Sequence, residues 1–565
     1  MLRCNGHKPV ATTRIPPVTR NSITSLFFAA LLAFFPALAV FGQTSSPSLK
    51  NAGTQSPKAV QPPKDRHVVV VVWDGMRPDL VTERNAPTLW KLARDGVTFR
   101  HHHSAYPTAT DINAAAIATG VYPNRNGLLA NEEYRPQINP KGPLENADIE
   151  VIKKADETSG GKYLSVATVA ETLRASGLST VVVGTKSAAY LQDRHSEWSS
   201  AASKNSITRF AAAPMASALR EETLRLLGPF RNGSTDTIDQ RNVYATRTLI
   251  EILWRNGVPS YSLLWLSDPD LTQHEYSPGA EQSIAAIHNS DRNLAAILDA
   301  LSKKQVRDKT DLFIVSDHGF STIERTIDFP AELRTAGFDA YAAFDQPPST
   351  GQVMVAENGA TILFYVIGRD GSVVRKLVDW LQHSDFAGVI FTREKFDGTF
   401  LLEAIRANTP DAPDVMVALR WNRKANRFGI PGQIITDTSR NAGQGSHASL
   451  SEFDVHNILF AAGPDFRRGM SSDLPSGNID LAPTILHCLG LTPPHKFDGR
   501  ILSESLTQDS TPLHSVTNTI EQTREFPDGK WRQYLRTTRL GETTYFDQGN
   551  GTFEPLKPAD PQAKQ

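Results

Sequence analysis

Val68-Val69-Val70-Val71-Val72-Trp73 is a continuous apolar run that follows His67 and is ended by Asp74-Gly75. A short, β-branched run of this kind is typical of a strand buried on both faces of a parallel sheet. Similar runs occur at 180–183, 262–266, 311–315, 361–366 and 457–461. Helical patterns lie at 86–93, 165–175 and 281–301. The alternation predicts a doubly wound α/β domain with a mostly parallel central sheet and helices on both faces.

The predicted strands are unevenly spaced along the chain. About 75 residues separate the run at 180–183 from that at 262–266, and about 90 separate 361–366 from 457–461. Insertions of this length are typical of lids or subdomains over a site. We therefore predict a catalytic domain at 67–508 with lid segments at 135–260 and 325–440. The polar, weakly periodic residues 509–565 are expected to form a peripheral extension.

The amino terminus has the pattern of a targeting segment. Basic residues between Arg3 and Arg20 precede an apolar run at 26–41, which contains the small-residue cleavage candidate Ala37-Leu38-Ala39. This order predicts a signal peptide at 1–42. The alternative is an uncleaved membrane anchor, against which the short run argues. Residues 43–66 resemble a flexible linker. The sequence thus predicts an exported protein, periplasmic or secreted, whose mature chain has no membrane span.

Composition excludes several classes of protein. The 565 residues are 40% hydrophobic, which supports a large core and excludes wholesale disorder. The 59 basic and 60 acidic side chains give a net charge of −1, so no basic field for nucleic acid is expected. Of the two cysteines, Cys4 lies in the predicted signal peptide. Cys488 alone cannot form an intramolecular disulfide and is expected to lie in the core.

Aspartate and histidine gather at the ends of the predicted strands. The six residues are Asp74, Asp270, His274, Asp317, His318 and His447. Carboxyl ends of parallel strands open into one crevice, so these groups are expected to converge. Carboxylate and imidazole ligands suit Zn²⁺, with Mn²⁺ or Co²⁺ as possible substitutes, and six are enough for two tetrahedral ions. A single aspartate at the end of a strand would more often cap the next helix. Because aspartate and histidine recur at several strand ends, we favour metal binding over helix capping.

Thr110 lies in Tyr-Pro-Thr-Ala-Thr-Asp-Ile-Asn, residues 106–113, just before a helix-compatible stretch of small residues. It could be a helix N-cap, which is a common role for threonine. It could equally be a nucleophile whose alkoxide is stabilised by metal, beside a helix N-terminus that receives an anion. The local spacing leaves both roles open.

Six short motifs in this order resemble the nucleotide pyrophosphatase/phosphodiesterase branch of the alkaline phosphatase superfamily, over about 67–506. They are residues 71–79, 106–113, 119–127, 268–274, 316–319 and 445–447. The resemblance implies one zinc bound by Asp270, His274 and His447. It implies a second zinc bound by Asp74, Asp317 and His318, with Thr110 as the remaining ligand and as the nucleophile that forms a phosphothreonine.

The resemblance also implies roles for residues beyond the metal ligands. Asn131, twenty-one residues after Thr110, would contact a phosphoryl oxygen. Lys186 corresponds to the lysine of a Lys-x-Arg pair in related phosphomonoesterases. In this chain, Ala188 occupies the position of that arginine. Two further departures are Asp111-Ile112 in place of the usual Phe-Pro, and Ala448 in place of a glycine. Asp111 would add negative charge beside the phosphate.

The sequence therefore predicts an exported two-zinc hydrolase of small-molecule phosphate diesters or pyrophosphates. A phosphomonoesterase on the same scaffold is the rival, and a phosphotransferase or a non-catalytic binding module are further alternatives. His101-His102-His103 is not expected to be a metal site, because successive strand residues point to opposite faces. The letters Gly443-Gln-Gly-Ser-His-Ala match a dinucleotide fingerprint, but no buried strand leads directly into them.

Overall fold

The computed structural model describes residues 65–194, 206–210, 217–229, 237–508 and 513–556. The predicted signal peptide and almost all of the predicted linker lie outside these ranges. Within them, no helix combines the length and the apolar character that a bilayer span requires.

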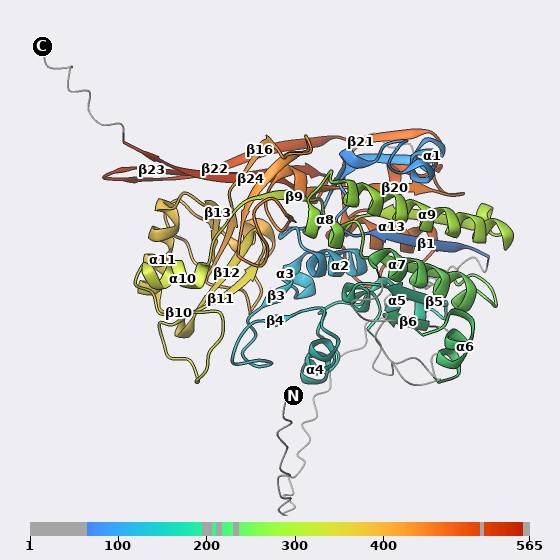
Figure 1. Cartoon of the computed structure of the whole chain (residues 1–565), viewed down its shortest axis with the longest axis horizontal. Helices are drawn as coiled ribbons and strands as arrows, with labels where there is room; N and C mark the ends of the chain where they lie inside the picture. Colours follow the sequence, from blue (N-terminus) through green and yellow to red (C-terminus); the bar gives the residue numbers. More distant parts are fainter. Residues whose placement is uncertain (1–64, 195–205, 211–216, 230–236, 509–512, 557–565) are drawn as a thin grey trace, which may run out of the picture. The chain divides into compact units, whose positions relative to one another are not determined.

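A mostly parallel sheet forms the centre of the described structure (Figure 1). Its strand order is β19-β2-β20-β8-β1-β7-β5-β6, with β21 beside β2. The strands are β1 (His67–Trp73), β2 (Val97–His103), β5 (Thr180–Gly184), β6 (Ser206–Phe210), β7 (Tyr261–Leu266), β8 (Thr310–Val315), β19 (His456–Asn457), β20 (Leu459–Ala462) and β21 (Met470–Gly477). β1 pairs in parallel with β7 and β8, and β20 introduces the antiparallel pairings with β8 and β2.

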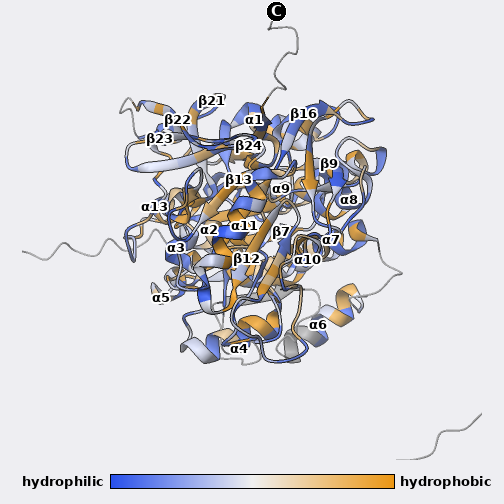
Figure 2. Cartoon of the chain, turned by 90° about the vertical axis from the view of Figure 1, so that its left-hand side faces the viewer, coloured by the Kyte–Doolittle hydropathy of each residue, from blue (hydrophilic) through white to orange (hydrophobic). Residues whose placement is uncertain are grey.

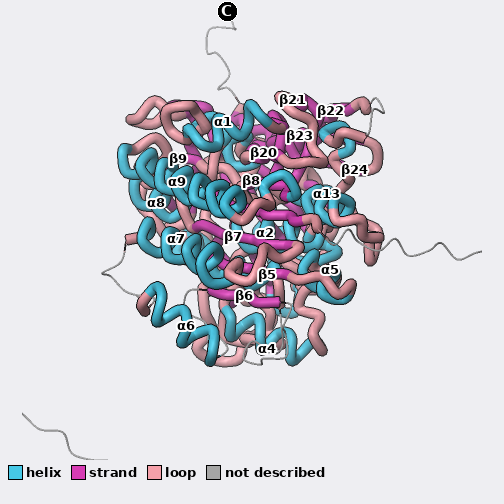
Figure 3. Tube along the Cα trace, turned by 90° about the vertical axis from the view of Figure 1, so that its right-hand side faces the viewer, coloured by secondary structure: helices cyan, strands magenta, loops and turns pink. Residues whose placement is uncertain are grey.

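Helices cover both faces of this sheet, as expected (Figure 3). Val68, Val70 and Val72 share one apolar core with α2 (Thr110–Thr119), α5 (Val169–Ala175) and α13 (Leu481–Cys488). Val69 and Val71 share the opposite core with α1 (Pro87–Asp95), α7 (Ile238–Arg247) and α9 (Glu281–Lys303). The alternation along β1 explains why its valines form an unbroken run: both faces are buried. The doubly wound α/β prediction is confirmed.

The apolar run at 361–366 is a strand, but it belongs to a second sheet with the order β10-β11-β12-β15-β13-β14. The strands are β10 (Ala340–Tyr341), β11 (Val353–Asn358), β12 (Thr361–Val366), β13 (Ala387–Thr392), β14 (Phe400–Leu401) and β15 (Val415–Leu419). One face packs on α10 (Phe329–Thr335) and α11 (Gly371–His383), and the other packs on Tyr106 and Ile112, which lie close to Thr110 in the sequence. Figure 2 views the molecule from the side on which this sheet and these two helices lie. Assigning this run to the central sheet was wrong, because burial on both faces does not reveal which sheet a strand joins.

The two segments predicted as lids differ from each other. Most of 325–440 forms the second sheet, and β16 (Trp421–Ala425) and β17 (Pro431–Thr436) join β9 (Ser321–Thr326) and β18 (Gly445–Ser446) in a further sheet. The range 135–260, in contrast, includes β5 and β6 of the central sheet and two of its covering helices. This range is therefore partly core, and it is not a single inserted lid.

The C-terminal region is more integrated than the sequence suggested. β22 (Ser515–Phe526), β23 (Gly529–Leu540) and β24 (Thr543–Pro555) form an antiparallel sheet. Trp531 and Leu535 on β23 are 0% and 1% exposed and join the cores around the second sheet. Gln533 receives the Ile390 N–H and donates to the Ile390 carbonyl of β13. The expectation of a peripheral extension was wrong, because the polar residues that alternate with these buried side chains masked the strand pattern.

The three consecutive histidines lie on β2 and take no part in the metal-capable clusters found among the described residues. His103 pairs with Asp547, while His102 is fully buried between Ser476 and Asn478. Burial lowers the pKa of His102 to about 3.

This shift predicts a pH dependence of stability. The folded pKa lies below the unfolded value of 6.5, so the stabilisation is complete above pH 6.5 and is lost as the pH falls towards 3. The free energy of unfolding changes by about 1.36 kcal/mol per pH unit for one such group. Between pH 6.5 and 5, the unfolding free energy of the wild type should therefore fall by about 2 kcal/mol more than that of His102→Asn. Urea unfolding at the two pH values measures this difference. Equal losses in both proteins would contradict the assignment.

Candidate active site

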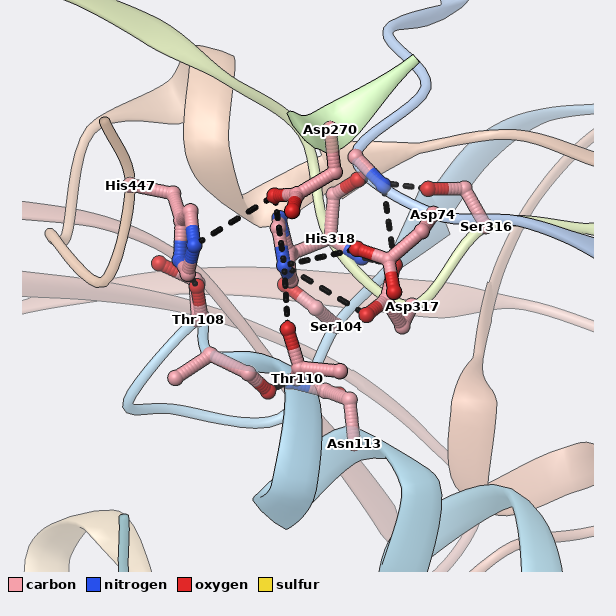
Figure 4. A network of polar contacts seen from close by, with 12 residues as sticks. Asp74, Ser104, Thr108, Thr110, Asn113, Asp270, Ser316, Asp317, His318 and His447 are labelled. Atoms are coloured by element: carbon pink, nitrogen blue, oxygen red, sulfur yellow. Dashed lines mark hydrogen bonds and ion pairs between the residues drawn. The ribbon is translucent and has the colours of Figure 1, made fainter. Parts of the chain in front are cut away.

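The carboxyl ends of three adjacent strands, β8, β1 and β7, carry most of the predicted ligands. Asp74 follows β1, Asp317 and His318 follow β8, and Asp270 begins α8 (Asp270–Tyr276) shortly after β7. His447 lies just after β18. All of these side chains are buried and point towards one another (Figure 4). The structure therefore brings these five predicted residues together at one edge of the sheet.

At this site, two groups of ligand atoms are close enough to hold metal ions. Asp74, Asp317 and His318 form one, and Asp270, His318 and His447 form the other, with ligand atoms within 4.8 Å of one another in each. The Nε2 of His318 lies 3.4 Å from Asp317 Oδ2 and 3.9 Å from Asp270 Oδ1. His318 thus belongs to both groups, whereas the set predicted around Asp270 and His447 contained His274 in its place. The His274 Nε2 lies 3.3 Å from Asp270 Oδ1, so this residue also faces the site.

Backbone carbonyls orient all three imidazoles. The Nδ1 atoms of His274, His318 and His447 lie 2.9, 2.8 and 2.9 Å from the carbonyls of Gly445, Gly319 and Thr108. A carbonyl only accepts, so each Nδ1 carries the proton and each Nε2 presents its lone pair to the cluster. Burial, and then the neighbouring His318, lowers the pKa of His447 well below its usual value, which keeps the ring neutral.

The carboxylates leave acceptor atoms facing the same space. Among the described residues, Asp270 Oδ1 and Asp317 Oδ2 are buried without a hydrogen-bond partner. A buried, unpartnered carboxylate oxygen is costly unless a cation lies beside it. These oxygens and the neutral imidazoles form a donor set that fits divalent cations of the zinc type.

Thr110 is the first residue of α2, and its side chain faces the ligands (Figure 4). Its Oγ1 lies 3.2 Å from His318 Nε2 and 3.1 Å from Lys186 Nζ. The N-cap of α2 is Ala109, so Thr110 does not have the capping role that was its alternative. Thr110 is 1% exposed, and its hydroxyl lies against His318, which belongs to both metal-capable groups.

Asn131 and Asp111 lie beside the start of α2. The Asn131 Oδ1 accepts the Asp111 backbone N–H at 2.9 Å, which leaves its NH₂ group available as a donor. The Asp111 carboxyl is 5% exposed and accepts the Ala147 N–H at 3.0 Å. Burial, together with Glu145, raises the pKa of Asp111 to about 8. This shift opposes the extra negative charge that the sequence led us to expect beside Thr110.

Lys186 contacts one aspartate from each of the two metal-capable groups. Its Nζ lies 2.6 Å from Asp270 Oδ2 and 3.0 Å from Asp74 Oδ1. Burial alone would lower the lysine pKa, but Asp270 and Asp74 outweigh it and raise the pKa, so the ammonium stays charged. Ala188, two residues on, is fully buried in the apolar core of the central sheet.

Two residues of the site were missed from the sequence. Trp265 on β7 donates from Nε1 to Asp74 Oδ2 at 2.7 Å. Asn478 donates to the Asp317 backbone carbonyl at 2.6 Å. The tryptophan was read only as one residue of a buried strand. The asparagine follows Asp317 by more than a hundred positions, and no local pattern marked it.

Comparison with known proteins agrees with this geometry. The family model described as type I phosphodiesterase/nucleotide pyrophosphatase matches residues 68–425. The human ectonucleotide pyrophosphatase/phosphodiesterase family member 7 is 21% identical over 428 residues, which cover 75% of this chain and 80% of that protein. A venom phosphodiesterase of Crotalus durissus collilineatus is 22% identical over 266 residues, 45% of this chain and 26% of that protein. The chain thus matches about a quarter of the venom enzyme's length.

Solved structures show the same fold. Human ectonucleotide pyrophosphatase/phosphodiesterase 5 superposes with a TM-score of 0.56 at 16% identity, over 78% of this chain and all of that one. An inactive murine form of that protein in complex with AMP gives 0.54 at 15% identity, with the same coverage. Because the family model covers more than half of the sequence, the chain belongs to the type I phosphodiesterase/nucleotide pyrophosphatase family.

Proposed function

We propose that the protein is an exported hydrolase of phosphate diesters or pyrophosphate bonds, with two zinc ions and Thr110 as its nucleophile. The observation that carries this proposal is the position of the Thr110 hydroxyl, 3.2 Å from the Nε2 of His318, which is the residue that the two metal-capable groups share. Family membership supports the reaction class. Export rests on the signal-like amino terminus, and N-terminal sequencing of the secreted protein would test it.

The donor set supports two metal positions. Asp270, His274 and His447 would hold one ion, and Asp74, Asp317, His318 and Thr110 the other, with His318 close enough to contact both. Two Zn²⁺ ions, or Mn²⁺ or Co²⁺ in their place, would supply Lewis-acid stabilisation of anionic oxygens and lower the pKa of a bound hydroxyl.

The protein groups account for the rest of the mechanism. The Thr110 hydroxyl gives its proton to solvent and its oxygen attacks phosphorus; as the new O–P bond forms, the P–O bond to the leaving group breaks, and the leaving oxygen departs with that electron pair and takes a proton from solvent. Water then hydrolyses the phosphothreonine and restores the hydroxyl. The Asn131 NH₂ group and the N-terminal turn of α2 donate to a non-bridging phosphoryl oxygen, while the Lys186 ammonium balances its charge.

We expect diesters to be hydrolysed in preference to monoesters. A monoester phosphoryl group carries about one more negative charge, and Lys186 is the one cation that contacts Thr110 among the described residues. A missing charge-assisted hydrogen bond costs roughly 1.5–3 kcal/mol, about one to two decades in rate. Comparing kcat/KM for bis(4-nitrophenyl) phosphate and 4-nitrophenyl phosphate measures the preference. A wide preference for the monoester would favour the phosphomonoesterase instead.

Ala188→Arg, which would rebuild the Lys-x-Arg pair, is not a clean test of this preference. The Ala188 side chain is fully buried among apolar residues, so a guanidinium there would destabilise the fold. Lys186→Met is the better variant, and it should lower kcat/KM for the diester by about one to two decades.

The natural substrate is proposed as a small-molecule phosphoester. The murine structural relative was solved with AMP, which supports a nucleotide among the candidates. Phosphoryl transfer to an alcohol would be seen as phosphorylated glycerol when turnover is run in glycerol. A non-catalytic binding module would turn over no phosphoester even when it is fully loaded with metal.

A further inference from the structure

Asn478, at the start of the 3-10 turn η7 (Asn478–Asp480), lies between the nucleophile and a metal-binding strand end. It is 1% exposed. Its Nδ2 donates to the Asp317 backbone carbonyl at 2.6 Å and to Asn113 Oδ1 at 2.9 Å. One of these partners follows β8, and the other lies on α2, one turn after Thr110 (Figure 4).

Backbone groups fix the orientation of both amides. The Asp317 carbonyl can only accept, so Asn478 must present its NH₂ group there. Asn113 Oδ1 accepts the Ala105 N–H at 2.6 Å, and its Nδ2 donates to the Ala109 carbonyl at 3.0 Å. Asn113 therefore braces the loop that leads to Thr110, and it offers its oxygen to Asn478.

The other side of Asn478 is held equally firmly. Its Oδ1 lies 3.0 Å from His102 Nε2. Asn457, on β19, donates to the Ser316 carbonyl. Two asparagines thus hold the consecutive carbonyls of Ser316 and Asp317, directly before His318.

We propose that Asn478 is a positioning residue that fixes Thr110 relative to Asp317 and His318. It touches neither substrate nor metal; it acts through Asn113 on the nucleophile loop and through the Asp317 backbone on the ligands. This inference rests on the proposed function. Misplacement of a reacting group by about 1 Å can cost about a hundredfold in rate, so a rigid buried link between the two loops has a direct catalytic consequence.

Asn478→Asp is the informative variant. It keeps the size and the acceptor facing His102, but it removes the donor to Asp317 and Asn113. We expect kcat to fall about 10- to 100-fold with KM changed less than about threefold. Zinc dissociation constants from chelator competition should rise about tenfold. Asn478→Ala provides the same readouts if the aspartate variant does not fold.

Asn126→Asp is the matched control. Asn126 is equally buried, donates to the Val121 carbonyl at 3.0 Å and accepts the Leu128 N–H at 2.9 Å, and neither partner is a candidate site residue. It should lose stability while keeping kcat and zinc affinity. If Asn478→Asp behaves in the same way, the positioning role is wrong.

A double-mutant cycle tests the link to Asn113. If the two residues act as one brace, Asn113→Ala combined with Asn478→Ala should lower kcat no further than the worse single variant. Multiplicative losses would overturn the link. A wild-type protein without phosphoester hydrolysis would instead overturn the proposed function, and the zinc affinities would then still test the hold on Asp317.

Discussion

Thr110→Ala is expected to lower turnover of a phosphodiester by at least about three decades, or about 4 kcal/mol of transition-state stabilisation. Alanine leaves no oxygen to attack phosphorus or to complete the group formed by Asp74, Asp317 and His318. Thr110→Ser restores the oxygen without the methyl group and should keep a measurable part of the activity. Steady-state kinetics on an aryl phosphodiester, with zinc in excess, compare the three proteins.

Thr119→Ala is the control that distinguishes a loss of catalysis from a loss of stability. Thr119 lies at the other end of α2, is fully buried and donates to the Ala115 carbonyl. Its variant should lose some stability and retain turnover. Trapping of a phosphorylated protein by acid quench should succeed with wild type and fail with Thr110→Ala. An alanine variant that works at close to the wild-type rate would show that water, not threonine, attacks phosphorus.

The ligand residues could be predicted because their positions follow from a rule about parallel sheets. Strands buried on both faces are visible as apolar runs, and the groups just after them meet at one edge. Asp74, Asp270 and Asp317 each follow such a run, and the structure brings them together. His447 is different: it follows the short strand β18, so only its motif marked it.

Other features were hidden because the sequence records neighbours along the chain and not in space. The run at β12 is as apolar as a central strand, yet it pairs with β11 and β15 in a second sheet. On β23 the buried Trp531, Gln533 and Leu535 alternate with Arg532, Tyr534 and Arg536, and one of the buried residues is polar, so the apolar pattern was weak. Asn478 reaches the site because β21 pairs with β2, so that η7, which follows β21, lies beside the residues that follow β8. Such links depend on topology and cannot be read from local periodicity.

Removal of metal is expected to abolish activity, and the purified protein should carry about two zinc ions per chain. The basis is the pair of unpartnered carboxylate oxygens, on Asp270 and Asp317, which face three imidazole lone pairs in a buried space. Without a metal ion, these two oxygen atoms would remain buried without a partner. Exhaustive chelation should therefore lower turnover by at least about three decades, and added zinc should restore it.

Single substitutions should remove the two ions one at a time. Asp270 belongs to one metal-capable group and Asp74 to the other, so Asp270→Asn and Asp74→Asn should each leave about one zinc per chain by elemental analysis. His318 lies within 3.9 Å of Asp270 Oδ1 and 3.4 Å of Asp317 Oδ2, so its alanine variant should weaken both ions. One zinc per wild-type chain, or full activity after chelation, would contradict the two-metal site. The buried carboxylates would then need another counter-charge, and the Lys186 ammonium, in contact with Asp74 and Asp270, is the group positioned to supply it.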